Sequence, residues 1–223
     1  MIVVASIFRN SAHYVDRYFE QIDKLRKDHR VRLVIAEGDS TDNTYDLLDA
    51  RLHENDTLLK VDHGGPEFAS VDNPQRWAQI AYVCNEVLRY LDMNESEKLI
   101  YVESDLAWPV DTMHYLINDL DRVGAVAAMS VQPSTGRFYD TWGHVGMDGV
   151  PFSPHPPFHP SLEHVRSGHL APIQSAGSCI AVRGEIVNQG VEFSNEDCIR
   201  GFCRTIRDHT PLMLDPDAVV YHR

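Results

Sequence analysis

Residues 31–44 read VRLVIAEGDSTDNT and join the end of a strand to the start of a helix. Val31–Ala36 is an apolar run of strand length, which is typical of a strand buried on both faces. Ser40 or Thr41 can cap a helix expected over Thr44–Leu52, because their hydroxyl oxygens accept bonds from free helical N–H groups. A strand–turn–helix unit of this kind predicts an α/β fold if it repeats along the chain.

The unit repeats on both sides of this stretch. Further strands are expected at Ile2–Phe8, Thr57–Val61, Lys98–Val102 and Ala125–Val131, and helices at His13–Lys27, Trp77–Leu91 and Asp111–Leu120. We therefore predict an α/β fold of Rossmann-like type, with a mostly parallel sheet flanked by helices. The chain has no GxGxxG after its first strand and no GxxxxGK[ST] anywhere, which disfavours an ordinary dinucleotide fold and a P-loop.

The second half of the chain has a different character. Proline, glycine and histidine crowd between Pro133 and Pro172, so neither a regular helix nor a central strand is expected there. A stretch this long inside a domain is typical of an active-site or acceptor-binding loop. Regular structure is expected again as a strand at Gln174–Val182, a helix at Glu196–Ile206 and a short strand at Ala218–Tyr221. At 223 residues, without a repeat or linker, the chain is expected to form one domain.

Composition limits the classes of partner. The net charge of −13 disfavours broad electrostatic binding to nucleic acid or anionic membrane. The chain has no apolar run of about 18 residues and no basic segment at its start, so stable membrane insertion and a signal peptide are not expected. Four cysteines without a CxxC pair favour reduced thiols. These features together favour a cytoplasmic protein.

Carboxylates follow one of the expected strands directly. Residues 99–105 read LIYVESD, so an apolar strand delivers Glu103 and Asp105 with one residue between them. Alternation along an extended chain lets both side chains point the same way. Hard oxygen ligands of this kind suit Mg²⁺ or Mn²⁺ bridging a diphosphate. Glu37 and Asp39 also lie at a strand end, where ligands bind in parallel α/β sheets.

The order of these segments resembles the GT-A glycosyltransferases, and especially the large inverting family whose second-strand motif reads like DDGSTDNT. YVESD at 101–105 resembles the DxD motif of that fold, with Glu103 in place of the first aspartate. Asn195–Asp197 is similar to the family's ED motif, and residues 216–223, PDAVVYHR, resemble a terminal strand whose histidine is often a metal ligand. The resemblance implies one GT-A domain over 1–223.

The resemblance also implies different roles for the two halves of the chain. Residues 1–131 would form the nucleotide-sugar-binding half, and residues 132–223 the acceptor-binding and catalytic half. Asp105 and His222 would hold Mn²⁺ or Mg²⁺, and Glu196 or Asp197 would act as general base. The nucleotide-sugar pocket would be lined by Ser6, Arg9, Glu37, Asp39, Arg76, Glu103 and Ser104.

The implied activity is metal-dependent transfer of a sugar from a UDP- or GDP-sugar donor to an acceptor hydroxyl, with inversion. The acceptor stays open: a glycan, small molecule, protein or modified nucleic-acid base would each fit. A nucleotidyltransferase is a rival, although it needs a glycine-rich phosphate loop that this chain lacks. A sugar-binding GT-A domain without catalysis is a second rival.

A narrower resemblance lies at residues 137–143, RFYDTWG. This segment is similar to the FYDTW segment of fungal capsule-associated α-mannosyltransferases, a family usually thought to retain anomeric configuration. The alternative of a retaining, mannosyltransferase-like enzyme is therefore open beside the inverting one. Tyr139 and Trp142 are candidate acceptor contacts, because aromatic rings stack on sugars. The histidines at 155, 159, 164 and 169 fit no standard zinc spacing.

Overall fold

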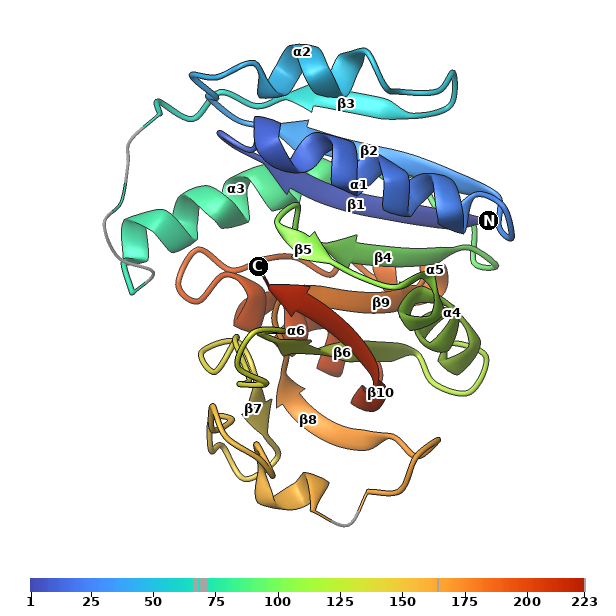
Figure 1. Cartoon of the computed structure of the whole chain (residues 1–223), viewed down its shortest axis with the longest axis vertical. Coiled ribbons are helices and arrows are strands. Elements are labelled where there is room, and N and C mark those ends of the chain that lie inside the picture. The colour runs from blue at the N-terminus through green and yellow to red at the C-terminus, as the bar shows by residue number, and fades with distance from the viewer. Residues whose placement is uncertain (66–67, 69–71, 164, 223) are drawn as a thin grey trace.

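The computed structural model of the chain describes residues 1–65, 68, 72–163 and 165–222. Its sheet has the strand order β3-β2-β1-β4-β9-β6-β10-β8-β7, and β5 pairs with β10 at the side (Figure 1). The strands are β1 (Ile2–Phe8), β2 (Val31–Glu37), β3 (Thr57–Lys60), β4 (Lys98–Val102), β5 (Leu106–Ala107), β6 (Ala125–Val131), β7 (Val145–Gly146), β8 (Ala171–Ser175), β9 (Cys179–Arg183) and β10 (Leu212–His222). The helices are α1 (Ala12–Leu25), α2 (Thr44–Asp49), α3 (Pro74–Tyr90), α4 (Val110–Asp119), α5 (Gly184–Val187) and α6 (Ile199–Arg207).

Most of the long strands run in one direction. β1 is parallel to β2 and β4, β2 is parallel to β3, and β6 is parallel to β10. β9 is antiparallel to both of its neighbours, β4 and β6, so these two strands share the direction of the others. The prediction of a mostly parallel α/β sheet flanked by helices is confirmed.

The side chains of β1 show why the sheet is covered on both faces. Val3 and Ala5 belong to one apolar cluster, and Val4 and Phe8 belong to the other. Helices α3, α5 and α6 contribute to the first cluster, and α1, α2 and α4 to the second. Burying one large apolar side chain stabilises the fold by about 1.5–3 kcal/mol, so two such clusters hold the sheet firmly.

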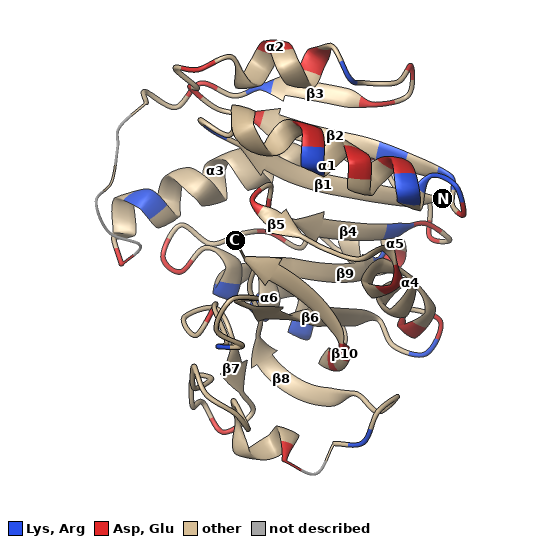
Figure 2. Ribbon diagram, viewed as in Figure 1, with Lys and Arg blue, Asp and Glu red and all other residues tan. Residues whose placement is uncertain are grey.

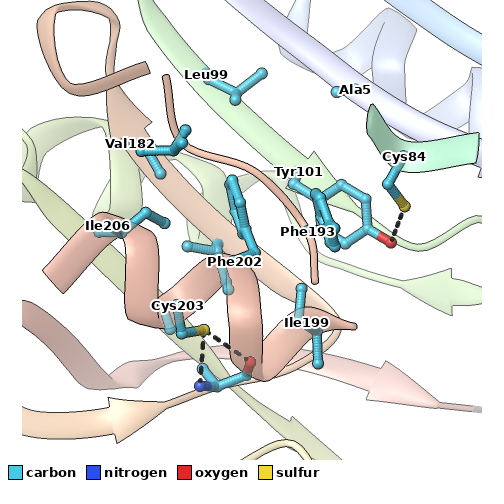
Figure 3. Close-up of a cluster of buried hydrophobic side chains, with 14 of the residues drawn as sticks. Ala5, Cys84, Leu99, Tyr101, Val182, Phe193, Ile199, Phe202, Cys203 and Ile206 are labelled. Atoms are coloured by element: carbon cyan, nitrogen blue, oxygen red, sulfur yellow. Dashed lines mark hydrogen bonds between the residues drawn. The ribbon is translucent and has the colours of Figure 1, made fainter. Parts of the chain in front are cut away.

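Aromatic rings close the first cluster near the end of β4. Phe193 and Phe202 stack with ring centroids 4.4 Å apart, and Tyr101 contacts Phe193 at 5.2 Å. Figure 3 shows these rings together between β4 and α6, with the Tyr101 hydroxyl reaching Cys84. The packing ties β4, which carries Glu103 and Asp105, to the loop before α6.

Two expected elements in the second half were wrong in their bounds. The strand expected at Gln174–Val182 is two strands, because the chain breaks at residues 176–178 and Ser178 has a φ of 67°. The helix expected from Glu196 starts only at Ile199. The backbones of Ser194 and Cys198 bond to each other, and Cys198 has a φ of 45°, so the preceding residues cannot be helical.

The last strand is longer than Ala218–Tyr221. β10 spans Leu212–His222, with a register shift against β6 between Asp215 and Val219. Its end pairs with β5, where His222 lies opposite Leu106. This pairing returns the end of the described chain to the strand that follows Asp105.

The stretch from Pro133 to Pro172 is largely irregular, as expected, but it has a core of its own. Phe138, His144, Phe152 and His159 are buried in it and contact one another in pairs. Its regular elements among the described residues are a 3₁₀ turn at Pro160–Leu162, the short β7 and the first two residues of β8. His164 lies outside the described residues.

Three general features complete the fold. None of the helices in the described ranges has the length and apolarity needed to cross a bilayer. The four cysteine thiols are free and buried, in accord with the expectation of reduced thiols. Acidic and basic residues are interspersed along the ribbon in Figure 2.

Candidate active site

A cleft of about 640 Å³ opens where β1, β2 and β4 end. Ligands of parallel α/β sheets bind at this edge, because the strand ends leave a crevice there. Apolar side chains from β1 and α3 form part of its wall, and polar side chains come from the segments after β1, β3 and β4. Among the residues expected to bind nucleotide-sugar or metal, the cleft is lined by Arg9, Arg76, Glu103, Ser104 and Asp105.

Asp105 and His222 meet at this edge. Oδ2 of Asp105 lies 2.7 Å from Nε2 of His222, and the pairing of β5 with β10 brings them there. The Tyr139 ring stacks on the His222 ring with centroids 3.5 Å apart. Arg17 donates a hydrogen bond of 2.6 Å to the Asp105 carbonyl, which fixes the backbone. The predicted metal-binding pair is thus placed side by side, while metal ligation itself stays a prediction.

The donor atoms of this pair fit a divalent cation. Oδ1 of Asp105 is enclosed and has no hydrogen-bond partner, so the carboxylate has an unsatisfied oxygen. Within the described ranges, no group of three or more His, Cys, Asp or Glu side chains is arranged to hold a metal. Carboxylate and imidazole suit Mn²⁺ or Mg²⁺, which commonly complete a sparse protein shell with phosphate oxygens and water.

Glu103 is the second carboxylate of the strand end. Burial raises its pKa to about 8, the negative charges of Asp105 and Asp140 add to that effect, and Arg76 opposes it. Its backbone N–H donates to the Ser178 carbonyl at 2.9 Å. A carboxyl group that stays protonated near neutral pH can donate a hydrogen bond, so Glu103 differs chemically from the charged aspartate that a DxD motif would place here.

Asp140 is a third carboxylate beside Glu103 and was not predicted. Its Oδ1 accepts the Gly143 N–H at 2.8 Å, and its Oδ2 accepts the Ser178 hydroxyl at 3.3 Å. Ser178 thus contacts Asp140 through its hydroxyl and the Glu103 backbone through its carbonyl. A Cβ at Gly177 would lie 1.5 Å from Asp140 Oδ2, so only glycine fits there. The sole sequence signal was the aspartate inside FYDTW.

The buried side chain of His144 contacts both Asp140 and the turn at residues 176–178. Its Nδ1 lies 3.1 Å from the Asp140 carbonyl oxygen and 3.3 Å from the Gly177 nitrogen, and its Nε2 lies 3.2 Å from the Ala128 carbonyl oxygen. Both ring nitrogens are satisfied and the side chain is fully buried. His144 therefore holds the turn at residues 176–178 in place beneath Asp140.

The two carboxylates after β2 are directed away from the cleft. Glu37 is buried, and its Oε1 accepts the Ser40 N–H at 2.8 Å. Asp39 accepts hydrogen bonds from the N–H groups of His63 at 2.6 Å and Gly65 at 3.0 Å. Both line a separate hollow of about 550 Å³. The structure thus brings neither into the lining of the main cleft.

Ser6 is not in that lining either. Its side chain is fully buried, and its hydroxyl donates to the Val102 carbonyl at 2.7 Å and contacts the Tyr18 hydroxyl at 2.9 Å. Ser6 thereby joins β1 to β4 and α1 below the cleft. Arg76 is directed by the start of α3, where Asn73 Oδ1 accepts the N–H of Gln75 and of Arg76.

Glu196 and Asp197 lie in the loop before α6 and outside the cleft lining. Glu196 is exposed. Arg204 donates to both oxygens of Asp197, at 2.7 and 3.1 Å. Burial alone would raise the pKa of Asp197, but the hydrogen bonds from Arg204 and Ser194 hold it below its ordinary value. Asp197 is therefore ionised at neutral pH.

The Trp142 ring is engaged by protein groups. It stacks on Trp77 with centroids 5.3 Å apart, and the Arg200 guanidinium lies 4.5 Å from its centroid. Arg200 also donates to the Trp142 carbonyl through Nε at 2.8 Å. This contact joins α3, α6 and the loop after β6. Tyr139, by contrast, is exposed beside His222.

The strand order, the acidic strand end and the histidine returned by β10 define a GT-A glycosyltransferase fold. The chain belongs to the family described as cryptococcal mannosyltransferase 1, whose model matches residues 1–198. A search of curated proteins by sequence finds no match.

Solved structures share the fold at low sequence identity. A mannosyltransferase from Pyrobaculum calidifontis, in complex with GDP-Man and Mn²⁺, has a TM-score of 0.61 and 18% identity over 99% of this chain and 56% of its own. S. aureus TarS, residues 1–349, has a TM-score of 0.60 and 12% identity over 99% of this chain and 59% of its own. A mycobacterial protein has a TM-score of 0.57 and 18% identity over 100% of this chain and 67% of its own. This chain thus spans little more than half the length of the first two.

Proposed function

We propose that this chain transfers a hexose, of mannosyl type, from a GDP-sugar to an acceptor hydroxyl, with a divalent metal. The observation that carries the proposal is the Asp105–His222 contact of 2.7 Å at the edge of the cleft. The mannosyltransferase family supports the sugar, and the GDP-Man and Mn²⁺ bound to the archaeal mannosyltransferase support the nucleotide and the metal.

Asp105 and His222 would hold the metal, which when bound supplies positive charge to neutralise the leaving diphosphate. Arg9 and Arg76 line the same cleft and add cationic charge near the diphosphate. Glu103 lines the same cleft beside Asp105 and would contact a ribose or phosphate oxygen. Charged groups held in place before the substrate binds stabilise the leaving diphosphate without reorganisation as the bond to the sugar breaks.

The acceptor hydroxyl must lose a proton during inverting transfer. We propose Asp197, with Glu196 as the neighbouring candidate, for the base. Asp197 is ionised, and its lowered pKa means that it would have to release Arg204 to accept a proton. Both residues lie outside the donor cleft, which agrees with a base that acts on the acceptor.

Retention of configuration is the second candidate. The FYDTW segment supports it, because it places Asp140 beside Glu103 within the family match. Asp197 would also have to give up part of its Arg204 pair to act as a base. The anomeric configuration of the first product, followed by NMR, distinguishes the two modes of transfer.

A thermal-shift panel tests the donor proposal directly. GDP-mannose, GDP-glucose, UDP-glucose and UDP-N-acetylglucosamine are each added with and without Mn²⁺. A ligand present at about 100 times its Kd stabilises the folded protein by about 2.7 kcal/mol. We expect the largest shift with GDP-mannose and Mn²⁺, and the loss of that shift with EDTA. An equal response to every compound, or none, would contradict the proposal.

A further inference from the structure

The cleft extends from Asp105 toward the residues that follow β3. In the order β3-β2-β1-β4, three inter-strand spacings of about 4.8 Å separate β3 from β4, or roughly 14 Å. His63 follows β3 and Asp105 follows β4, and both line the cleft. If the diphosphate lies at Asp105, as the proposed function requires, the attached nucleoside extends toward His63.

The His63 side chain is only 8% exposed, and its ring packs against the end of β2. A Cβ at Gly38 would lie 3.2 Å from Cδ2 and 3.3 Å from Nε2 of this ring, so the glycine leaves the room that the imidazole fills. Nδ1 is enclosed and makes no hydrogen bond. The ring is thus held rigidly in the cleft wall, with one polar edge available to a ligand.

Asp39 fixes the backbone that carries this ring. Its Oδ2 accepts the N–H groups of His63 and Gly65 and lies 3.4 Å from His63 Nδ1. Arg9 donates to the Gly65 carbonyl at 2.7 Å from the cleft side. The segment from His63 to Gly65 is therefore held between an arginine and an aspartate. The carboxylate of Asp39 is used by this segment and lines the other hollow.

We propose that His63 is the residue of this chain that recognises the nucleobase, and that Asp39 is a positioning residue acting through it. An anionic oxygen beside Nδ1 favours the proton on that nitrogen, which leaves Nε2 as a hydrogen-bond acceptor. Guanine presents N1–H and its 2-amino group side by side to such an acceptor, whereas the one donor of uracil on that edge, N3–H, is flanked by two carbonyl oxygens. The inference rests on the proposed donor binding and adds the residue that selects the base.

Isothermal titration with GDP, UDP and inorganic pyrophosphate, each with Mn²⁺, tests this assignment. Removing one hydrogen bond to the base costs about tenfold in affinity. We expect His63→Ala to weaken GDP binding by about that factor, to bring the Kd values of GDP and UDP closer together, and to leave pyrophosphate binding unchanged. His63→Gln, which keeps a polar acceptor, should retain part of the GDP affinity. His53→Ala is the control, because His53 is exposed.

The role of Asp39 is tested by a double-mutant cycle. Asp39→Asn keeps an oxygen for the two backbone N–H groups but removes the charge beside Nδ1. We expect it to weaken GDP binding several-fold in the wild-type background and to have no further effect in His63→Ala.

The outcomes separate the two proposals. Unchanged GDP affinity in His63→Ala would overturn the assignment of His63, and additive effects would overturn the role of Asp39. If wild-type protein binds GDP and UDP no more tightly than pyrophosphate, the proposed nucleotide donor fails as well, and that result appears before any variant is made.

Discussion

Nε2 of His222 and Oδ2 of Asp105 lie 2.7 Å apart although they come from opposite halves of the chain. The contact exists because β5, directly after Asp105, pairs with the end of β10. Asp105→Asn keeps the shape of the side chain but removes its charge. We expect Mn²⁺-dependent GDP binding to fall by about 100-fold or more, since even groups that only support a ligand are worth 10–100-fold. Transfer should be abolished.

Calorimetry of GDP with and without Mn²⁺ measures this loss, and circular dichroism checks the fold. Asp111→Asn serves as the control, because that carboxylate is exposed on α4. Wild-type turnover by Asp105→Asn in the presence of metal would contradict the metal assignment.

His222→Ala tests the other half of the pair. The backbone pairing of β10 with β5 survives this change, so we expect the melting temperature to change little. Mn²⁺-dependent GDP affinity should fall by roughly 10–100-fold, while binding without metal should not change. Tyr221→Phe is the matched control on the same strand. Unchanged metal-dependent affinity in His222→Ala would mean that this histidine only packs against Tyr139.

The regular alternation of strands and helices made the first half of the fold predictable. Strands as apolar as Ile2–Phe8 have one stable place in an α/β protein, which is a sheet covered on both faces. The antiparallel β9 was not predictable, because its break from β8 depends on a backbone turn at Ser178 that only tertiary contacts with Asp140 explain.

The residues of the candidate site were predictable only where they follow strands. Glu103, Asp105 and Arg9 could be predicted to lie together because they follow strands, and all three line the cleft. Asp39 also follows a strand, yet its carboxylate is used by a loop that comes 24 residues later in the chain. Asp140 lies in an irregular segment, where neither periodicity nor a strand end indicates direction, and His63 follows the short β3 only after two further residues.

Asp197→Asn tests the proposed base. A positioned general base contributes roughly 10²–10⁴-fold to the rate, so kcat should fall by that order while GDP affinity changes little. Arg204→Gln is the companion variant, because it breaks the ion pair but leaves the carboxylate. Full turnover by both Asp197→Asn and Glu196→Gln would remove the base from the inverting mechanism and support the retaining one.

Gly177→Ala tests the close packing of the turn at residues 176–178 against Asp140. The new Cβ would lie 1.5 Å from Asp140 Oδ2, so the carboxylate or the turn must move. Overpacking of this kind costs about 1–3 kcal/mol, and the hydrogen bond from the Ser178 hydroxyl to Asp140 should be lost with it. Asp140→Ala removes the obstructing atoms, so the double variant should be more stable than additivity of the two changes predicts. Additive melting temperatures would show that Gly177 is required for another reason.

The buried carboxylates Asp119 and Asp215 make stability depend on pH in a defined direction. Burial raises the pKa of Asp119 to about 6, and the charge of Asp215 beside it adds to the effect. The folded state therefore keeps a proton that the unfolded state releases near pH 4, so the free energy of unfolding should fall as pH rises from about 4 to 6 and level off above pH 6.

Asp119→Asn removes this charge without changing the shape of the side chain. We expect it to raise the free energy of unfolding at pH 7.5 by about 1–2 kcal/mol and to leave it nearly unchanged at pH 4. Urea unfolding at both values measures the effect, with Glu54→Gln as the control because Glu54 is exposed. Equal effects of Asp119→Asn at the two pH values would show that the pair carries no buried proton.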